Sequence, residues 1–284
     1  MKAIKPVFFY IIVGLTTFSC SKDTDNTTIL PLVEPYHEQD VYYGPGKDQS
    51  FDIYLPANRN SDTKTIILVH GGGWSGGDKK DMNAFKDLIL QEFPSLAIVN
   101  MNYRLADHVH APYPMQIDDI TTVVDELKNR KNDYNISEKI GFIGTSAGAH
   151  LALLWSYAFS THKNVEMVCS MVGPTNFTDP AYLNNTNPEL QGMIDLFGIK
   201  PEIPFLKKIS PYHQATASSP PTILFYGAKD PLIPVTQGTA MRDKLISLNV
   251  SHEFILYSNG GHGWVGPDLL DTWIKLKTFM QAHL

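Results

Sequence analysis

A serine, an aspartate and a histidine follow three different apolar segments in the second half of the chain. Ser146 lies in Gly-Thr-Ser-Ala-Gly, Asp230 in Gly-Ala-Lys-Asp-Pro and His262 in Gly-Gly-His-Gly-Trp. A serine hydroxyl is a poor nucleophile at neutral pH, and an imidazole must accept its proton as attack begins. A carboxylate holds that imidazole in the required tautomer and stabilises its cation. These residue types predict attack on a carbonyl carbon by Ser146, assisted by His262 and Asp230.

The surroundings of Ser146 are typical of a sharp turn between a strand and a helix. The apolar segment 139–143 precedes the serine, and the helix-like segment 149–157 follows it. Flanking glycines let the backbone approach closely where a Cβ atom would clash. The amino end of a helix stabilises the negative charge that develops on the substrate oxygen. This context favours a nucleophile over an ordinary turn, which is the alternative for the pentapeptide alone.

Three consecutive glycines follow the apolar segment 65–69, in the sequence His-Gly-Gly-Gly-Trp that begins at His70. Such a run frees several backbone amides to point at one oxygen atom, as an oxyanion loop must. We expect His70 to orient the loop through its ring nitrogens. The amides expected to form the oxyanion hole are those of Gly72, Gly73 and Ala147, with Trp74 as an alternative donor.

Simpler interpretations exist for the other two members of the predicted triad. An aspartate before a proline commonly caps a turn, and a histidine between glycines can lie in a surface loop. The order Ser146, Asp230, His262, with each residue directly after a predicted strand, favours the triad.

Several further residues are assigned supporting positions near this site. Arg104 is expected to pair with Asp118 or Asp119, although a solvated arginine is an equal alternative. His150 follows Ser146 by one helical turn and is interpreted as a packing residue that supports the site from behind. The candidates for the walls of a substrate pocket are Trp74, Tyr103 and Trp264.

The elements that must position these residues alternate between strands and helices. Continuous apolar runs of about five residues are typical of strands buried on both faces of a parallel sheet. Apolar residues at steps of three and four predict helices between them. The alternation predicts an α/β protein whose central, mostly parallel sheet carries helices on both faces. The expected strands are 50–55, 65–69, 96–99, 139–143, 166–169, 222–226 and 252–257. The segment 174–221 is interpreted as an insertion, a partial lid before the strand that carries the acid.

The motifs together resemble those of α/β-hydrolase esterases related to hormone-sensitive lipase, and more closely those of bacterial feruloyl and acetylxylan esterase-like enzymes. The stretch Asn-Tyr-Arg-Leu-Ala that begins at Asn102, followed by Pro112, Pro114 and Asp118, adds to the likeness, which covers residues 48–284. Only a short segment precedes the first predicted strand, whereas the hormone-sensitive-lipase group has a substantial N-terminal cap. This departure favours an open site for small or polysaccharide-bound esters.

The resemblance implies a serine carboxylesterase that works through an acyl-enzyme intermediate. Its implied substrates are short-chain acyl esters, or feruloyl and acetyl esters of plant polysaccharide. An arylformamidase-like or lipid esterase remains an alternative, as does a silent hydrolase fold used for binding. The triad chemistry requires no cofactor, and no histidine has metal-ligand spacing with carboxylates or cysteines. The acyl group, the alcohol and the oligomeric state are not predicted.

The composition and the N-terminus bear on location and partners. The chain of 284 residues has a formal charge of −6 and no dense Lys/Arg stripe, which disfavours nucleic acid as a partner. Two lysines and an apolar run precede Cys20, as in a lipoprotein signal; an ordinary signal with a chance cysteine is the alternative. We therefore expect a signal at 1–19, a lipidated Cys20 and tether over 20–34, and one catalytic domain over 35–284. The implied location is a bacterial envelope, with the lipid as the only membrane attachment.

Overall fold

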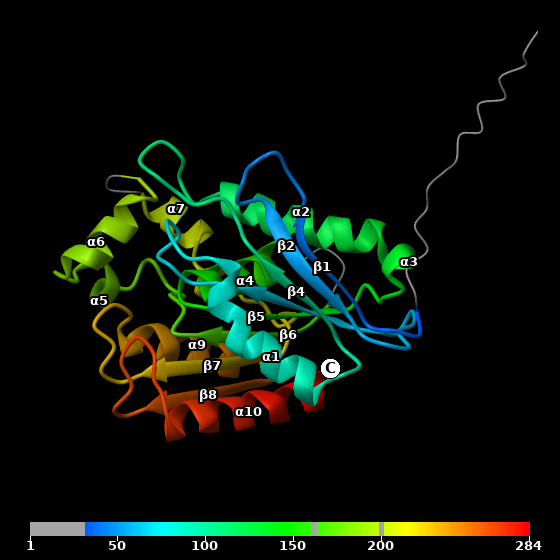
Figure 1. Ribbon diagram of the computed structural model, residues 1–284. Helices are drawn as coiled ribbons and strands as arrows, with labels where there is room; N and C mark the ends of the chain where they lie inside the picture. Colours follow the sequence, from blue (N-terminus) through cyan, green and yellow to red (C-terminus); the bar gives the residue numbers. More distant parts are fainter. Residues whose placement is uncertain (1–31, 161–163, 199–201) are drawn as a thin grey trace, which may run out of the picture.

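An eight-stranded sheet forms the centre of the protein (Figure 1). The computed structural model describes residues 32–160, 164–198 and 202–284. The strand order is β1-β2-β4-β3-β5-β6-β7-β8; β2 is antiparallel to β1 and β4, and all other neighbours are parallel. The mostly parallel sheet predicted from the apolar runs is therefore confirmed. The strands are β1 (Tyr36–Tyr42), β2 (Ser50–Leu55), β3 (Thr65–Val69), β4 (Ala97–Met101), β5 (Ile140–Thr145), β6 (Val165–Met171), β7 (Thr222–Gly227) and β8 (His252–Tyr257).

The first strand is the one that the apolar pattern missed. Strands β3 and β4 are buried at every position, which explains their continuous apolar sequences. By contrast, most residues of β1 are exposed or half-buried, so its sequence carries no apolar run. Its pairing with β2 begins at Tyr36, opposite Leu55, and Tyr54 in turn pairs with Ile98 near the start of β4. Strand β1 therefore starts at the end of the sheet where the parallel strands have their amino termini.

The helices cover the two faces of the sheet, as the alternating pattern predicts. Alternate residues of β3 belong to two separate cores. Ile66 and Leu68 pack with α1 and α10, whereas Ile67 and Val69 pack with α2, α4 and α9. None of the helices in the described part of the chain is long and apolar enough to span a membrane. The helices are η1 (Lys79–Met82), α1 (Asn83–Glu92), α2 (Met115–Asn129), α3 (Lys131–Tyr134), α4 (Ala147–Ala158), α5 (Pro180–Leu183), α6 (Pro188–Asp195), α7 (Ile203–Lys208), α8 (Pro211–Gln214), α9 (Val235–Ser247) and α10 (Pro267–His283).

Four of these helices, α5 to α8, lie in the segment that connects β6 to β7. Figure 1 shows α5, α6 and α7 beyond the carboxyl ends of the strands. Proline occupies the first turn of each of the four, where a helix needs no backbone N–H. That this segment forms a partial lid stays a prediction.

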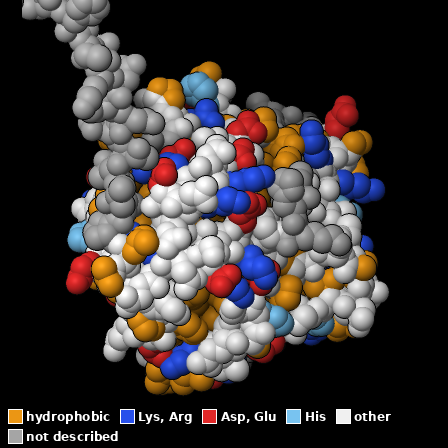
Figure 2. Space-filling view, turned by 90° about the vertical axis from the view of Figure 1, so that its right-hand side faces the viewer, with side chains coloured by type: hydrophobic (Ala, Val, Ile, Leu, Met, Phe, Trp, Pro, Cys, Tyr) orange, Lys and Arg blue, Asp and Glu red, His pale blue; other side chains and the backbone are white. Residues whose placement is uncertain are grey.

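The opposite end of the molecule is shown in Figure 2. Acidic and basic side chains are interspersed on this face. Glu166 at the start of β6, for example, lies 3.4 Å from the ammonium groups of both Lys64 and Lys139. The predicted signal, lipidated Cys20 and most of the predicted tether fall within residues 1–31, outside the described residues.

Candidate active site

Ser146 lies between β5 and α4 in a backbone conformation that residues other than glycine rarely adopt. Its φ is 49° and its ψ is −118°, and the amide of Ser146 donates to Met171 O at 2.8 Å. The flanking glycines are sterically required. A Cβ atom on Gly148 would lie 2.2 Å from the carbonyl oxygens of Val69 and His70, and one on Gly144 would lie 2.6 Å from Gly148 O. The turn therefore holds the Ser146 side chain at the carboxyl end of the sheet.

The three residues of the predicted triad lie within hydrogen-bonding distance of one another. His262 Nε2 is 2.9 Å from Ser146 Oγ, and His262 Nδ1 is 2.8 Å from Asp230 Oδ2. The Asp230 side chain is only 1% exposed, whereas that of His262 is 25% exposed. A carboxylate that cannot reach water and faces Nδ1 fixes the tautomer in which Nε2 accepts the serine proton.

Backbone hydrogen bonds join the loops that carry Asp230 and His262. The amide of Lys229 donates to Gly260 O at 2.8 Å, and the amide of Ala228 donates to Tyr257 O at 2.9 Å. A Cβ atom on Gly227 would lie 2.2 Å from Gly261 O, so only glycine permits this approach. Two segments that are distant in sequence are thereby brought to one place.

The glycine loop after β3 passes directly beside the nucleophile. A Cβ atom on Gly71 would lie 3.3 Å from the Ser146 Cβ atom. Gly72, Gly73 and Trp74 have φ values of 111°, 57° and 63°, so the backbone stays in the left-handed region for three residues. Among the described residues, the amides of Gly72, Gly73 and Ala147 have no hydrogen-bond acceptor. Free amides around a nucleophile can bind an oxyanion.

His70 and Tyr103 support this loop from inside the fold. The two rings stack with centroids 4.2 Å apart. The Tyr103 hydroxyl donates to His70 O at 2.9 Å, and His70 Nδ1 lies 2.6 Å from Gly71 O. Burial lowers the pKa of His70 and raises the pKa of Tyr103, so both stay neutral near pH 7. Of the two ring nitrogens expected to orient the loop, Nδ1 makes such a contact, whereas the buried Nε2 has no hydrogen-bond partner among the described residues.

The three candidates for pocket walls differ in how far their side chains are exposed to solvent. Tyr103 is fully buried and Trp74 is 2% exposed, so both lie behind the loop and not at an open surface. Trp264 is half-buried; its ring packs on Tyr257 at 4.7 Å and its Nε1 donates to Thr272 Oγ1 at 2.7 Å. The sequence places Trp74 and Trp264 beside glycines and Tyr103 in the Asn-Tyr-Arg-Leu-Ala stretch, but it carries no signal of which side of the loop they face.

Two residues near the oxyanion loop had no sequence signal that pointed to them. Gln116 is buried in the first turn of α2, and its Nε2 donates to Trp74 O at 2.6 Å and to Arg104 O at 2.8 Å. Met193 of α6 covers Gly73: a Cβ atom on Gly73 would lie 3.0 Å from Met193 Sδ. In the sequence, Gln116 is a polar residue beside Ile117 in a predicted amphipathic helix, and this position alone does not mark it as part of a site.

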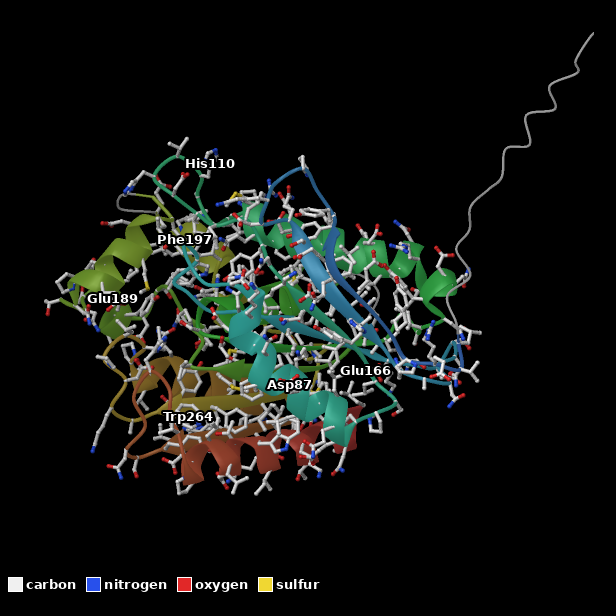
Figure 3. The ribbon with its side chains drawn as sticks, in the orientation of Figure 1. Asp87, His110, Glu166, Glu189, Phe197 and Trp264 are labelled. Carbon is white, nitrogen blue, oxygen red and sulfur yellow. The ribbon has the colours of Figure 1, made fainter. Side chains whose placement is uncertain are left out.

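A cleft of about 480 Å³ opens beside Met193. Its walls come from Ser75, the segment 106–108 and α6 with Leu196. In Figure 3, Glu189 of α6 and Phe197 lie at the same end of the molecule as His110, and Glu166 lies far from them. Met193, which covers Gly73, is also one of the residues that line this cleft. No cluster of residues within the described ranges has the composition of a metal site.

Arg104 pairs with Asp119 and not with Asp118, the other partner considered from the sequence. The Arg104 Nη2 atom lies 2.7 Å from Asp119 Oδ1, and the Arg104 amide donates to Asp119 Oδ2 at 2.8 Å. Gln49 Nε2 also donates to Asp119 Oδ1, at 3.0 Å. The Asp119 side chain is only 1% exposed. Its carboxylate therefore holds Arg104 in place in the loop that follows β4.

Two relatives of this chain are named as esterases. Esterase LipC of Mycobacterium tuberculosis is 24% identical over 262 residues, which cover 83% of this chain and 61% of LipC. The acetyl esterase of Salmonella paratyphi B is 30% identical over 115 residues, which cover 39% of this chain and 34% of that enzyme. The chain thus spans less than two thirds of the length of these relatives.

Solved structures identify the fold. A truncated carbohydrate esterase from gut microbiota superposes with a TM-score of 0.69 at 21% identity, over 88% of this chain and 99% of that one. Together with the sheet topology, this likeness confirms the predicted α/β-hydrolase fold. The family model named BD-FAE matches residues 51–245, more than half of the chain. The chain therefore belongs to the BD-FAE family.

Proposed function

We propose that the protein is a serine carboxylesterase with Ser146 as nucleophile, His262 as general base and acid, and Asp230 as the residue that orients His262. The observation that carries the proposal is the pair of hydrogen bonds at 2.9 Å and 2.8 Å that joins these three side chains. The named esterases among the relatives support the same class of reaction.

The proposed reaction has two halves. Ser146 Oγ attacks the ester carbonyl carbon while His262 Nε2 takes its proton, and the amides of Gly72, Gly73 and Ala147 stabilise the oxyanion. Collapse of the tetrahedral intermediate breaks the bond to the alcohol oxygen, which receives the proton from His262. Water, activated by His262, then hydrolyses the acyl-serine ester and releases the acid. The buried Asp230 stabilises the imidazolium in both halves.

The proposed substrates are esters of carbohydrates with a short acyl group such as acetyl, or with a feruloyl group. The carbohydrate esterase that shares this fold supports the alcohol part, and the acetyl esterase among the relatives supports a short acyl part. The position of Met193 against Gly73 narrows the space above the oxyanion loop, which favours a small acyl group.

The nucleophile is tested with p-nitrophenyl acetate and the Ser146→Ala variant. Because the triad acts as a unit, we expect kcat to fall by about 10⁴-fold or more, with an unchanged melting temperature. Ser247→Ala is the matched control, since this serine is exposed on α9 and its hydroxyl donates only to Lys244 O. A Ser146→Ala variant that keeps near-normal turnover would refute the assignment.

The substrate class is tested separately, with acetylated xylan, methyl ferulate and a short-chain triglyceride. Preference for the first two, measured as kcat/KM, supports a carbohydrate-directed esterase. Preference for the triglyceride would identify a lipid esterase with the same triad.

A further inference from the structure

His150 is a buried histidine that the proposed mechanism does not use. It lies on α4, and its amide donates to Ser146 O at 3.1 Å. The side chain is 1% exposed and makes two hydrogen bonds. Its Nδ1 lies 3.1 Å from Trp74 Nε1, and its Nε2 lies 2.8 Å from Ile209 O. One ring therefore connects the nucleophile helix, the oxyanion loop and the segment between β6 and β7.

The two partners fix the protonation state and the tautomer of His150. A carbonyl oxygen can only accept, so Nε2 must carry the hydrogen that faces Ile209. An indole N–H can only donate, so Nδ1 must present its lone pair to Trp74. Burial lowers the pKa of His150 to about 4, which keeps the ring neutral in neutral solution. The ring is thus an oriented acceptor for Trp74.

Trp74 needs such a contact because its backbone conformation is unfavourable for a bulky residue. Its φ of 63° lies in the left-handed region, which large side chains rarely adopt without tertiary support. Its carbonyl oxygen accepts from Gln116 Nε2 and from the Ala106 amide. Its ring packs edge-on against His150 and Phe197, with centroids 5.5 Å and 4.9 Å apart. The indole hydrogen bond is the polar contact that sets the rotation of this ring.

We propose that His150 is a positioning residue for the oxyanion hole. By holding Trp74, it fixes the backbone of Gly72 and Gly73 relative to Ser146, which directly precedes the helix that carries His150. The inference rests on the proposed function, because it assumes that these amides stabilise an oxyanion. It also links the loop to the segment between β6 and β7, since Ile209 O anchors the other side of the ring.

Two isosteric substitutions separate the two hydrogen bonds of His150. In His150→Asn, the Oδ1 atom takes the place of Nδ1 and can accept from Trp74, while the bond to Ile209 is lost. In His150→Gln, the Nε2 atom keeps the bond to Ile209, while the bond to Trp74 is lost. Each variant therefore loses one of the two hydrogen bonds and keeps the other.

We expect His150→Gln to lower kcat for p-nitrophenyl acetate by about tenfold or more, because a displaced oxyanion donor acts on the transition state. KM should change by less than about twofold, because the substrate ground state makes little use of the hole. The inhibition constant of phenylboronic acid, whose adduct with serine has an oxyanion-like oxygen, should rise by the same factor as kcat falls. His150→Asn should keep kcat and this constant near the values of the unaltered protein.

Trp74→Phe tests the same hydrogen bond from the donor side, and it replaces His150→Gln if that variant does not fold. It removes the indole N–H and should reproduce the loss of kcat, and the double variant should lose no more than either single one. The Trp74 indole proton, observed by NMR, should shift in His150→Gln and stay in place in His150→Asn.

Equal loss of kcat in the Asn and Gln variants, or unchanged kcat in His150→Gln, would overturn the inference. If the unaltered protein hydrolyses no ester, the proposed function fails instead. An indole proton that stays in place in His150→Gln would then still overturn the contact between His150 and Trp74.

Discussion

At the scale of single residues, the two carboxylate oxygens of Asp230 make two different kinds of contact. Its Oδ1 accepts from the amides of Leu232 and Ile233, at 2.8 Å and 2.9 Å, and its Oδ2 faces His262. The turn-capping and triad interpretations of this aspartate therefore describe one conformation. The turn orients the carboxylate, and the oriented carboxylate presents one free oxygen to the imidazole.

Gly148 offers a direct test of how tightly the nucleophile turn is packed. An alanine Cβ would lie 2.2 Å from two backbone carbonyl oxygens, and we expect Gly148→Ala to lower the free energy of unfolding by about 3 kcal/mol. Gly192→Ala on α6 is the control, because no atom lies within 4 Å of its added Cβ; it should raise stability by about 0.5–1 kcal/mol. Urea denaturation measures both. Equal stability of the two variants would mean that the turn can relax.

Some site residues could be predicted because the residues beside them in the sequence form a recognisable local pattern. Ser146 directly follows β5, whereas Asp230 and His262 lie in the loops that follow β7 and β8, and the structure brings the three together. The burial of Trp74 and Tyr103 could not be predicted in the same way, because it depends on side chains that pack from distant segments. Met193 and Gln116 were missed for the same reason, since their contacts with the oxyanion loop arise only in three dimensions.

At the scale of elements, the parallel strands were predicted and the first strand was not. A strand buried on both faces must be apolar along its length, whereas β1 forms an exposed edge and needs only backbone pairing with β2. The helices α1, α2, α9 and α10 follow their apolar periodicity, because each packs one face against the sheet. The segment between β6 and β7 is organised by caps and prolines, which predict short helices less clearly.

Asp119 joins three elements, and its loss should destabilise the fold. Its carboxylate on α2 binds Arg104 after β4 and Gln49 before β2. We expect Asp119→Ala to lower the free energy of unfolding by about 3 kcal/mol, because several hydrogen bonds to a buried charge are lost together. Asp118→Ala is the matched control: Asp118 is exposed on α2 beside Asp119, and its loss should cost less than about 1 kcal/mol. Thermal and urea unfolding measure the difference, and equal costs would argue against the Asp119 contacts as a structural tie.

At the scale of the whole molecule, two cores of different size lie on the two faces of one sheet. The larger one contains the oxyanion loop, α4 and the segment between β6 and β7, so the site is built on the more extensive of the two. The smaller one, between the sheet and α1 with α10, supports the opposite face.

We propose that the whole protein is held at a bacterial membrane by a lipid on Cys20. Cys20→Ala should abolish incorporation of labelled palmitate and release the protein from the membrane fraction, because no thiol remains at the signal junction. Cys169→Ala is the control, since Cys169 is a fully buried free thiol on β6. Unchanged membrane partition of Cys20→Ala would contradict the lipoprotein proposal.

The direction of β1 gives such an anchor a geometric meaning. Tyr36 starts this strand at the amino-end edge of the sheet, and Ser146 follows β5 at the carboxyl-end edge. An anchor that precedes β1 would therefore enter at one pole of the molecule, and ester cleavage would take place at the other. A tethered molecule with this polarity would hold its reaction centre outward from the bilayer, where it can work on polymers far too large to approach a membrane-facing site.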